Sequence, residues 1–253
     1  MSALLRIEAL RKDFIGAAGT VTALEDIDLE VSEGELAVIV GPSGCGKSTL
    51  LNIVAGLELA SSGQALIDGH PITAPGADRG MVFQSYTLFP WLSVRQNVEF
   101  GLRIKGVPSA QRIVQARHYL ELVGLGEFED ALPKELSGGM KQRVAIARVL
   151  ANTPRMLLMD EPFGALDAQT RMLLQELLLK IRSQEQNTVL FITHDIDEAI
   201  LLADNVYVMS RRPGRLKARI PVAIPRPRDH WATVSAEFAA VKARIMGLLW
   251  EEL

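Results

Sequence analysis

The sequence predicts an α/β fold with a largely parallel sheet, together with an antiparallel β subdomain and an inserted α-helical subdomain. The first observation is a set of short, β-rich apolar runs that begin at Glu35, Arg79, Arg155, Thr188 and Asn205. Most of these runs are continuous rather than alternating, which suits strands buried on both faces. The second observation is that helical patterns follow several of the runs, as in βαβ units.

The pattern of each further segment predicts its element in turn. Residues 4–10 and 22–31 alternate between apolar and polar side chains, so we expect two antiparallel strands beside the core. Residues 91–152 show no clear strand and are expected to form several helices. Apolar residues recur at helical spacing in three stretches that follow apolar runs, residues 47–57, 168–184 and 195–203.

We expect these elements to form a single domain over residues 1–253. Residues 1–87 and 153–210 are assigned to the α/β core with its β subdomain, and residues 88–152 to the helical subdomain. Residues 211–253 are expected to be a C-terminal extension, rich in Arg and Pro, that ends in a short helix near Phe238–Leu249.

Composition restricts the classes of protein to consider. The chain has 253 residues, of which 48% are hydrophobic and 23% charged, an ordinary globular composition. Its formal net charge of −3 argues against binding nucleic acid through overall basicity. The single cysteine cannot form an internal disulfide. No apolar run approaches the roughly 18 residues of a spanning helix, so we expect a cytoplasmic protein that could still dock onto a membrane protein.

The stretch GPSGCGKST matches the phosphate-loop pattern G-x-x-x-x-G-K-[ST]. It follows a predicted buried strand and begins a predicted helix, the setting that this motif requires. Glycines allow backbone amides to turn toward phosphate oxygens, Lys47 supplies a positive charge, and Ser48 offers a hydroxyl to Mg²⁺. We therefore predict that this loop binds a nucleotide through Gly41, Pro42, Ser43, Gly44, Cys45, Gly46, Lys47, Ser48 and Thr49.

Cys45 lies inside this loop and admits two interpretations. It could be a redox switch or a small apolar residue that fills space. The sequence around it offers no partner thiol or histidine base, which favours the packing interpretation.

Polar residues follow two other predicted strands. Asp160 and Glu161 end the run RMLLMDE, and ligands bind at this carboxyl edge in open α/β sheets. Asp160 could hold Mg²⁺, and Glu161 is placed to orient and deprotonate an attacking water, although a solvated acidic turn before Pro162 is the alternative. His194 ends the next strand and is predicted to contact the γ-phosphate rather than to be a structural histidine. Asp195 is expected to cap the helix that follows.

The stretch ELSGGMKQRVAIARVL predicts a helix whose start could bind an anion. Ser137 occupies the N-cap position, Gly138 and Gly139 follow, and apolar residues recur at helical spacing. Free amides at a helix N-terminus favour anions. No lysine is placed here as in a phosphate loop, so the anion is not identified by these residues alone.

Together, GPSGCGKS, Gln84, LSGG, LLMDEP, ALD and ITHD resemble the ATP-binding subunits of ABC transporters, over essentially the whole chain. The resemblance implies a P-loop NTPase (RecA-like) core that binds ATP and Mg²⁺, with Ser48, Gln84 and Asp160 at the metal. It further implies that Gln84 senses Mg²⁺ and the docked membrane subunit, that Asp167 lies in a loop crossing a dimer, and that Phe14 stacks on adenine.

The resemblance also implies a head-to-tail dimer of two such subunits. Ser137, Gly138 and Gly139 would then hold the γ-phosphate of the ATP on the partner's phosphate loop. The family usually reads LSGGQ, whereas this chain has Met140 in place of the glutamine. Methionine cannot complete a capping box, so we expect a weaker helix start, and a heterodimer is an alternative to the homodimer.

Residues 79–102 and the stretch IPRPRDH resemble the nitrate, sulfonate and taurine importer group. The predicted function is therefore to power an importer for a small anion at the cytoplasmic face of the membrane. The resemblance implies permease subunits as partners, which Phe89, Pro90 and Trp91 would contact, and indirectly a periplasmic substrate-binding protein. Packing within the helical subdomain is the alternative role for Phe89 and Trp91.

Other functions compete with this prediction. The chain could serve an importer for another small solute, or be a soluble ABC ATPase of DNA repair or translation. Such ATPases usually carry two cassettes or a long coiled coil, which this chain lacks. A small-molecule kinase is disfavoured by the SGG helix start and the ITHD motif. The basic run from Arg211 to Arg228 is either a solvated face or an attraction for anionic lipid.

Overall fold

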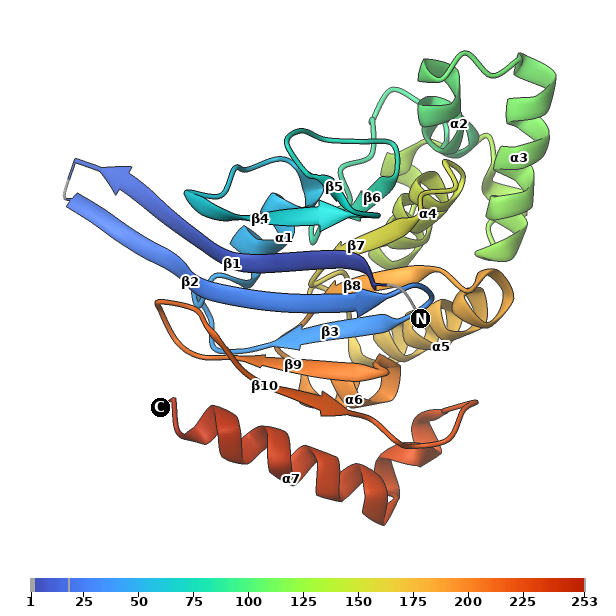
Figure 1. The fold of residues 1–253 in the computed structure, drawn as a ribbon. Helices are drawn as coiled ribbons and strands as arrows, with labels where there is room; N and C mark the ends of the chain where they lie inside the picture. The colour runs from blue at the N-terminus through green and yellow to red at the C-terminus, as the bar shows by residue number, and fades with distance from the viewer. Residues whose placement is uncertain (1–2, 18, 253) are drawn as a thin grey trace. The chain divides into compact units, whose positions relative to one another are not determined.

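The computed structural model describes residues 3–17 and 19–252, which form two compact units. The first unit contains the chain up to Gly76 and from Gln186 onward, and the second contains Ala77–Glu185. Figure 1 shows the strands and helices of each unit along the chain.

The first unit contains a four-stranded antiparallel sheet, in which the order is β2-β1-β4-β5. Alternating burial along β1 places Leu5 and Ile7 in the core and Arg6 in solvent, as the sequence pattern predicts. The strands are β1 (Ala3–Gly16), β2 (Gly19–Ser32), β4 (Ser62–Ile67) and β5 (His70–Pro71).

The same unit contains the strands that carry the phosphate loop. β3 (Leu36–Val40) pairs in parallel with β8 (Thr188–Ile192) and β9 (Asn205–Met209), and β9 pairs antiparallel with β10 (Leu216–Pro221). Every residue of β3 and β8 is buried, which explains their continuous apolar sequences. The unit also includes α1 (Lys47–Ala55), α6 (Ile196–Leu202), η3 (His230–Val234) and α7 (Ala236–Trp250).

The second unit combines two parallel strands with helices. β6 (Arg79–Val82) pairs with β7 (Met156–Asp160), and Val82 lies opposite Met159. The helix α4 (Gly138–Leu150) packs on β6 and on the helices α2, α3 and α5. The helices are α2 (Val94–Ile104), α3 (Ser109–Leu122), η1 (Gly126–Phe128), η2 (Pro133–Glu135), α4 (Gly138–Leu150) and α5 (Ala168–Glu185).

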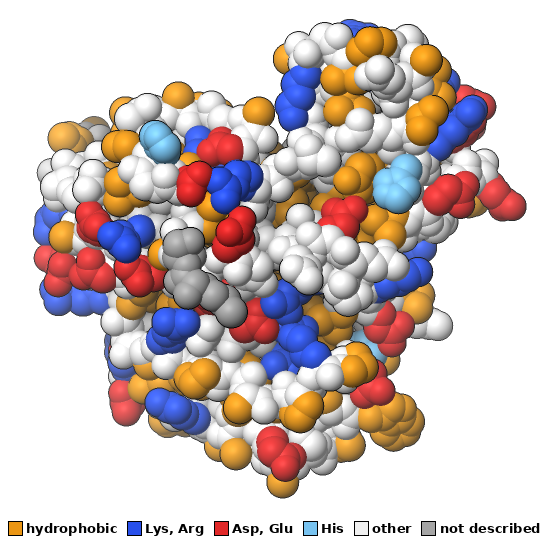
Figure 2. All heavy atoms as spheres, turned by 45° about the vertical axis from the view of Figure 1, so that its right-hand side comes forward, with side chains coloured by type: hydrophobic (Ala, Val, Ile, Leu, Met, Phe, Trp, Pro, Cys, Tyr) orange, Lys and Arg blue, Asp and Glu red, His pale blue; other side chains and the backbone are white. Residues whose placement is uncertain are grey.

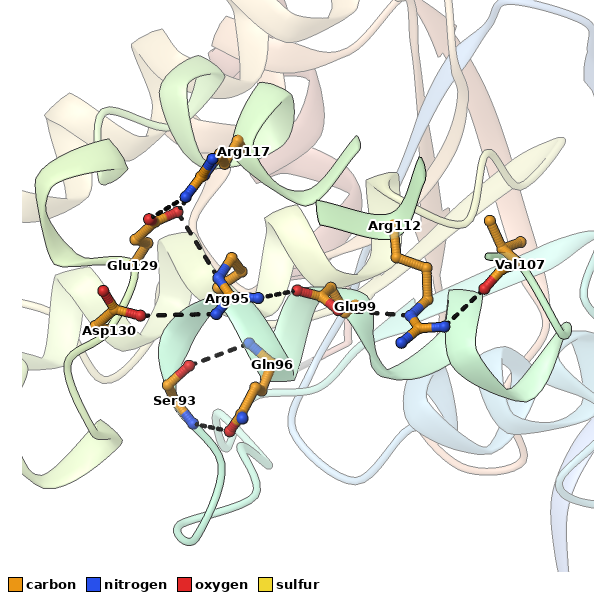
Figure 3. A network of polar contacts seen from close by, with 9 residues as sticks. All are labelled: Ser93, Arg95, Gln96, Glu99, Val107, Arg112, Arg117, Glu129 and Asp130. Carbon is orange, nitrogen blue, oxygen red and sulfur yellow. Dashed lines mark hydrogen bonds and ion pairs between the residues drawn. The ribbon is translucent and has the colours of Figure 1, made fainter. Parts of the chain in front are cut away.

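Charged side chains tie α2 to α3 and to the segment after α3 (Figure 3). Arg95 of α2 contacts Glu99 one turn later and Glu129 at 3.8 Å. Arg112 of α3 reaches Glu99 at 3.5 Å, and Arg117 of α3 donates to Glu129 at 2.8 and 2.7 Å. The Arg117 hydrogen bond lowers the pKa of Glu129. These contacts fix the helical part with charges rather than with apolar burial alone.

The predicted fold class is confirmed. The structure differs from the prediction where the sequence pattern of an element is weak. The strands expected at Glu35, Arg79, Arg155, Thr188 and Asn205 all form, and each ends one or two residues before its apolar run does. The sequence did not predict β4, β5 or β10. The C-terminal helix begins at Ala236, earlier than expected, because Ser235 accepts a hydrogen bond from the Phe238 N–H at 3.1 Å and caps it.

Charges of both signs are interspersed on the face drawn in Figure 2. The basic run predicted from the sequence is largely paired with acids, which favours a solvated face over attraction for anionic lipid. Its ion pairs include Arg211–Glu252 at 3.9 Å, Arg215–Glu25 at 2.6 Å, Lys217 with Glu251 and Glu252 at 2.8 Å each, Arg219–Glu35 at 3.8 Å and Arg226–Asp204 at 3.0 Å. None of the helices in residues 3–17 and 19–252 has both the length and the apolar character needed to cross a bilayer.

Candidate functional site

The phosphate loop occupies the turn between β3 and α1. Gly44 and Gly46 have φ values of 75° and 107°, a backbone region that residues other than glycine adopt only with strain. A Cβ on Gly46 would lie 2.7 Å from a methyl group of Leu24 and 3.0 Å from the Ala23 carbonyl oxygen. Gly44 and Gly46 therefore allow the turn, and Gly46 also allows the close approach of β2. No side chain caps α1, so its first amides face the loop.

Lys47 is buried within this loop, with 6% of its surface exposed. Its Nζ atom donates to the carbonyl oxygens of Gly41 at 2.8 Å and Pro42 at 3.0 Å. The two carbonyls hold the ammonium at the centre of the turn, where a bound phosphate would meet it. Ser43 and Ser48 are exposed, and Thr49 is half-buried at the start of α1.

Cys45 is packed beneath the loop and is only 1% exposed. Burial raises the pKa of its thiol, and the nearby Lys47 ammonium, 3.9 Å from the sulfur, only partly offsets this effect. A thiol with a raised pKa has little thiolate at neutral pH and reacts slowly with oxidants. This geometry favours the packing interpretation of Cys45.

His194 lies two residues beyond the end of β8, and its side chain is exposed. β8 is parallel to β3, and the Thr193 N–H donates to the Ile39 carbonyl at 3.2 Å. The histidine and the phosphate loop therefore leave the same edge of adjacent strands. Asp195 caps α6 as the sequence predicts, because its side chain accepts hydrogen bonds from two backbone N–H groups of the first turn.

Phe14 lies on β1, in the four-stranded sheet of the first unit, and is 42% exposed. The Lys12 ammonium lies 4.9 Å from the centroid of its ring. Lys12 is itself held by Glu58 at 2.6 Å and by the Leu59 carbonyl at 2.7 Å. This contact fixes one side of an exposed aromatic ring, which is compatible with a stacking role for Phe14.

In the second unit, Gln84 and Glu161 follow the paired strands β6 and β7. A Cβ built on Gly164 would lie 3.7 Å from both the Gln84 amide nitrogen and a Glu161 carboxylate oxygen, so both groups face the same small space. Asp160 is the last residue of β7 and is half-buried. Glu161 has a φ of 42°, which is rare for a residue with a side chain and is common at functional sites.

The SGG segment begins α4 as predicted. The Ser137 Oγ atom accepts a hydrogen bond from the Met140 N–H at 3.3 Å, so the serine cap is present without the family's usual glutamine. A Cβ on Gly139 would lie 2.4 Å from the Thr170 methyl group, and one on Gly138 would lie 2.9 Å from the Tyr86 hydroxyl. These glycines allow α4 to approach α5 and the segment that follows Gln84.

Asp167 lies immediately before α5 and caps it. Its carboxylate accepts a hydrogen bond from the Thr170 N–H at 2.9 Å, and this bond is the main reason that the pKa of Asp167 is lowered. Asp167 is exposed, and the cap leaves the start of α5 beside the start of α4 through Thr170 and Gly139. The structure thus brings the SGG segment and the Asp167 loop together within one chain.

Three residues near these groups were not assigned to the site from the sequence. Gly164 lies between Gln84 and Glu161, Arg212 donates to the phosphate loop, and Arg148 donates to the Thr87 carbonyl at 2.8 Å. Desolvation lowers the pKa of Arg148. Arg148 lies in the stretch that forms the SGG helix and Arg212 in the basic run, but their contacts join residues far apart in the chain, so no local pattern predicts them.

The chain is similar to known proteins in both sequence and fold. Residues 24–164 match the family model described as ABC transporter. An uncharacterised ABC transporter ATP-binding protein of Methanocaldococcus jannaschii is 51% identical over 253 residues, which cover 100% of this chain and 94% of the relative. A nitrate import ATP-binding protein of Synechocystis is 52% identical, covering 87% of this chain and 83% of the relative.

Two further proteins widen this comparison. A bicarbonate transport ATP-binding protein of Synechococcus elongatus is 48% identical, covering 92% of this chain and 36% of the relative. A dimeric ATP-binding cassette bound to ADP and phosphate in a post-hydrolysis state is 32% identical, with a TM-score of 0.77 over 87% of this chain and 100% of that one.

A component of an ABC transporter complex from Clostridium perfringens has a similar fold. It is 31% identical, with a TM-score of 0.79, and the alignment covers 99% of this chain and 100% of that one. The phosphate loop after a buried strand, the acids at the end of β7 and the capped SGG helix are thus set in a fold shared with known ATP-binding cassettes. By its family match and its relatives, the chain belongs to the ABC transporter family, as an ATP-binding subunit with ATPase activity.

Proposed function

We propose that this ATPase powers the import of a small anion such as nitrate, a sulfonate or taurine. The observation that carries the proposal is the 52% identity to a nitrate import ATP-binding protein over most of both chains. A relative named for bicarbonate transport, another small anion, supports the same class of cargo. The anion crosses through permease subunits, and a periplasmic substrate-binding protein delivers it to them.

The nucleotide roles follow from the chemistry of each group. The amides of residues 41–49 surround the phosphates of ATP, and Lys47 moves its ammonium from the loop carbonyls to the outer phosphates. Phe14 stacks on adenine, and His194 contacts the γ-phosphate. Glu161 orients the attacking water and accepts its proton.

Oxygen donors at these positions suit Mg²⁺. The Ser48 hydroxyl, the Gln84 amide oxygen and the Asp160 carboxylate would hold the ion, and none of the three side chains is fully buried. Within the described residues, no cluster of three or more His, Cys, Asp or Glu side chains could hold a metal ion. When bound, Mg²⁺ supplies charge neutralisation for the phosphates.

Substitution of Glu161 tests the assignment of the general base. Glu161→Gln keeps the size and the hydrogen-bonding reach of the side chain but cannot accept the proton. We expect ATP to bind while hydrolysis falls by about 10²–10⁴-fold. Lys47→Ala is the matched control, because it should weaken binding itself. Near-normal turnover of the Glu161→Gln variant contradicts the assignment.

The SGG segment is proposed to act on the partner's nucleotide in a head-to-tail dimer. The solved dimeric cassette among the similar structures supports dimerisation of this chain. Each chain contributes one phosphate loop, so the capped start of α4 is available for the γ-phosphate held by the partner. A homodimer is the simpler case, and a heterodimer is compatible with Met140.

Mixed dimers test this arrangement. One chain carries Lys47→Ala, the other Ser137→Arg, and both carry Glu161→Gln so that bound ATP is trapped. Each homodimer has a defect in both sites, whereas a mixed dimer has one intact site if Ser137 acts in trans. Recovery of about one trapped nucleotide per mixed dimer is expected. No recovery in verified mixed dimers rejects the sandwich for this protein.

A hollow in the second unit is the proposed contact for the permease. Its volume is about 600 Å³, and its apolar lining includes Phe89, Phe100 and Ile104. The Phe89 ring lies 4.3 Å from Phe100 and 5.7 Å from Trp91, measured between centroids. Trp91 is 72% exposed and lies against Phe89, so it extends the apolar surface of the hollow. This contact would place the chain at the cytoplasmic face of the membrane.

Co-purification separates the importer subunit from a soluble ATPase that works without a permease. Trp91→Ala should reduce recovery of the permease subunits while leaving ATP binding intact, because Trp91 is exposed. Phe89→Ala is expected to weaken both folding and assembly, since Phe89 packs within the unit. Unchanged assembly of the Trp91→Ala variant would place the contact elsewhere.

A further inference from the structure

The loop that joins β9 to β10 lies directly against the phosphate loop. The Gly214 N–H donates to the Ala23 carbonyl at 2.9 Å, and the Gly214 carbonyl accepts from the Glu25 N–H at 3.0 Å. A Cβ on Gly214 would lie only 2.1 Å from the Cys45 carbonyl oxygen. The glycine therefore allows backbone contact between the β9–β10 loop and the phosphate loop.

Arg212, from the same loop, reaches the phosphate loop with its guanidinium. Its Nε and Nη2 atoms donate to the Gly44 carbonyl at 3.3 and 3.1 Å. These residues are separated by 168 positions in the sequence. The hydrogen bonds are charge-assisted, which makes them stronger than bonds between neutral groups, although Arg212 is exposed and water screens part of the effect.

The accepting carbonyl belongs to the Gly44–Cys45 peptide group, whose N–H is also engaged in a hydrogen bond. Because a trans peptide is planar, the Gly44 carbonyl and the Cys45 N–H point in opposite directions. The Cys45 N–H donates to the Pro42 carbonyl at 3.3 Å. The peptide is thus held at both ends. If it turned over, both hydrogen bonds would break and the turn of the phosphate loop would change.

The β9–β10 loop is itself anchored to the C-terminal end of the chain. The Arg211 N–H donates to the Glu252 carboxylate at 2.8 Å, and Lys217 pairs with Glu252 at 2.8 Å. The Ser210 hydroxyl donates to the Pro213 carbonyl at 3.1 Å within the loop. These contacts on both sides of Arg212 hold its backbone in place while its side chain reaches Gly44.

We propose that Arg212 is a positioning residue that holds the Gly44–Cys45 peptide in the orientation of the phosphate-loop turn and thereby strengthens nucleotide binding. The inference rests on the proposed role of residues 41–49 in binding ATP. Without Arg212, the Gly44–Cys45 peptide adopts other orientations part of the time. The apparent affinity for nucleotide then falls in proportion to the fraction of molecules that keep the binding orientation. Affinity should change for ADP and ATP alike, so the loss appears in KM rather than in kcat.

ADP binding to the full-length protein, measured by calorimetry with Mg²⁺, tests this role. Arg212→Gln should bind ADP about 3–10-fold more weakly, the scale of one charge-assisted hydrogen bond reduced by exposure. Arg211→Gln is the matched control, because it removes the same charge one residue away without a contact to Gly44. It gives up only a 3.9 Å side-chain ion pair with Glu252 and keeps the backbone N–H that binds Glu252. Arg212→Lys keeps the charge and one donor and should recover part of the affinity. ATP turnover of Arg212→Gln should show a raised KM and a kcat within about twofold of the parent.

The outcomes distinguish this inference from its alternatives. Equal losses in Arg212→Gln and Arg211→Gln would indicate general attraction between positive charge and nucleotide and would overturn the positioning role. Unchanged binding by Arg212→Gln would also overturn it. If Lys47→Ala binds ADP normally, the nucleotide site itself is misassigned, which is a different failure. If Arg212→Gln does not fold, the Arg212→Lys variant becomes the test. If that variant binds ADP with the parental affinity at both low and high salt, the result counts against the hydrogen bond.

Discussion

Arg228 is a buried guanidinium whose removal should destabilise the first unit. Only 6% of its surface is exposed. Its Nη1 atom donates to the carbonyls of Ile200 at 3.0 Å and Ala203, and its Nη2 atom donates to the Val222 carbonyl at 2.8 Å. Because Ile200 lies in the last turn of α6, the cation satisfies carbonyls that a helix end leaves without partners and also faces the negative end of the helix dipole.

The size of the effect follows from these contacts. Arg228→Met keeps most of the apolar stem but leaves several buried carbonyls without a donor, at about 1 kcal/mol or more each. Removing the charge also removes its own cost of burial, which offsets part of the loss. We expect a net loss of about 2–4 kcal/mol in the free energy of unfolding. For a chain of this length, that corresponds to roughly 5–15 °C in Tm.

Thermal and urea unfolding of the full chain measure this loss. Arg226→Met is the matched control, because Arg226 lies two residues away on a more exposed surface, where it pairs with Asp204 at 3.0 Å and donates to only one carbonyl, that of Leu202, at 2.6 Å. Its expected cost is about 1 kcal/mol or less. Arg228→Lys should fall between the parent and the methionine variant, since three donors cannot reach all the carbonyls. If Arg228→Met unfolds within about 0.5 kcal/mol of the parent, the reasoning about buried carbonyls is wrong.

Two further predictions concern the phosphate loop and the SGG segment. Cys45→Ser should keep most of the ATPase activity, and alkylation of Cys45 in the folded protein should follow a pH profile shifted above that of a free cysteine, because burial raises its pKa. Rapid alkylation at neutral pH would contradict the packing role. Gly139→Ala should destabilise the second unit by about 1–3 kcal/mol through contact with the Thr170 methyl group. Thr170→Ser, which removes that methyl group and keeps the hydroxyl, should restore stability, and failure of this rescue would locate the strain elsewhere.

The fold was predictable where burial dictates the sequence. β3 and β8 are buried along their whole length and consist of apolar runs, so their pattern is unambiguous. β10 has one fully buried residue, Ile220, and lies at the edge of its sheet, where one face and one side meet solvent. β4 begins with three exposed residues, and Gly63 in it approaches the Ala9 carbonyl. Edge strands and irregular strands carry little periodicity, so no sequence pattern marks them.

The candidate site was predictable where one short segment contains several of its groups. The phosphate loop, the acids after β7 and the Ser137 cap each lie within a few residues of a strand end or a helix start. The space shared by Gln84 and Glu161 depends on the pairing of β6 with β7, which joins residues far apart in the chain. The contact between Arg212 and Gly44 likewise depends on tertiary structure. The left-handed backbone of Glu161 has no signal in the residue type, because glutamate rarely adopts it.

In the SGG segment, Ser137 and Gly139 each have a structural role within the chain and a proposed role toward the partner's nucleotide. A single substitution therefore affects both roles. Within the chain, Gly139 is needed because Thr170 leaves no room for a side chain, and Ser137 caps α4 through the Met140 N–H. Any substitution of Gly139 therefore disturbs the packing of α4 on α5 before it affects an anion on another subunit. Ser137→Ala removes the serine hydroxyl, at a cost of about 1 kcal/mol for the lost cap, and keeps the backbone amides open. Comparing Ser137→Ala with Ser137→Arg separates the loss of the serine hydroxyl from the blocking of the anion. An additional loss of trapped nucleotide in the Ser137→Arg homodimer marks the blocking, and its recovery in mixed dimers with Lys47→Ala supports binding in trans.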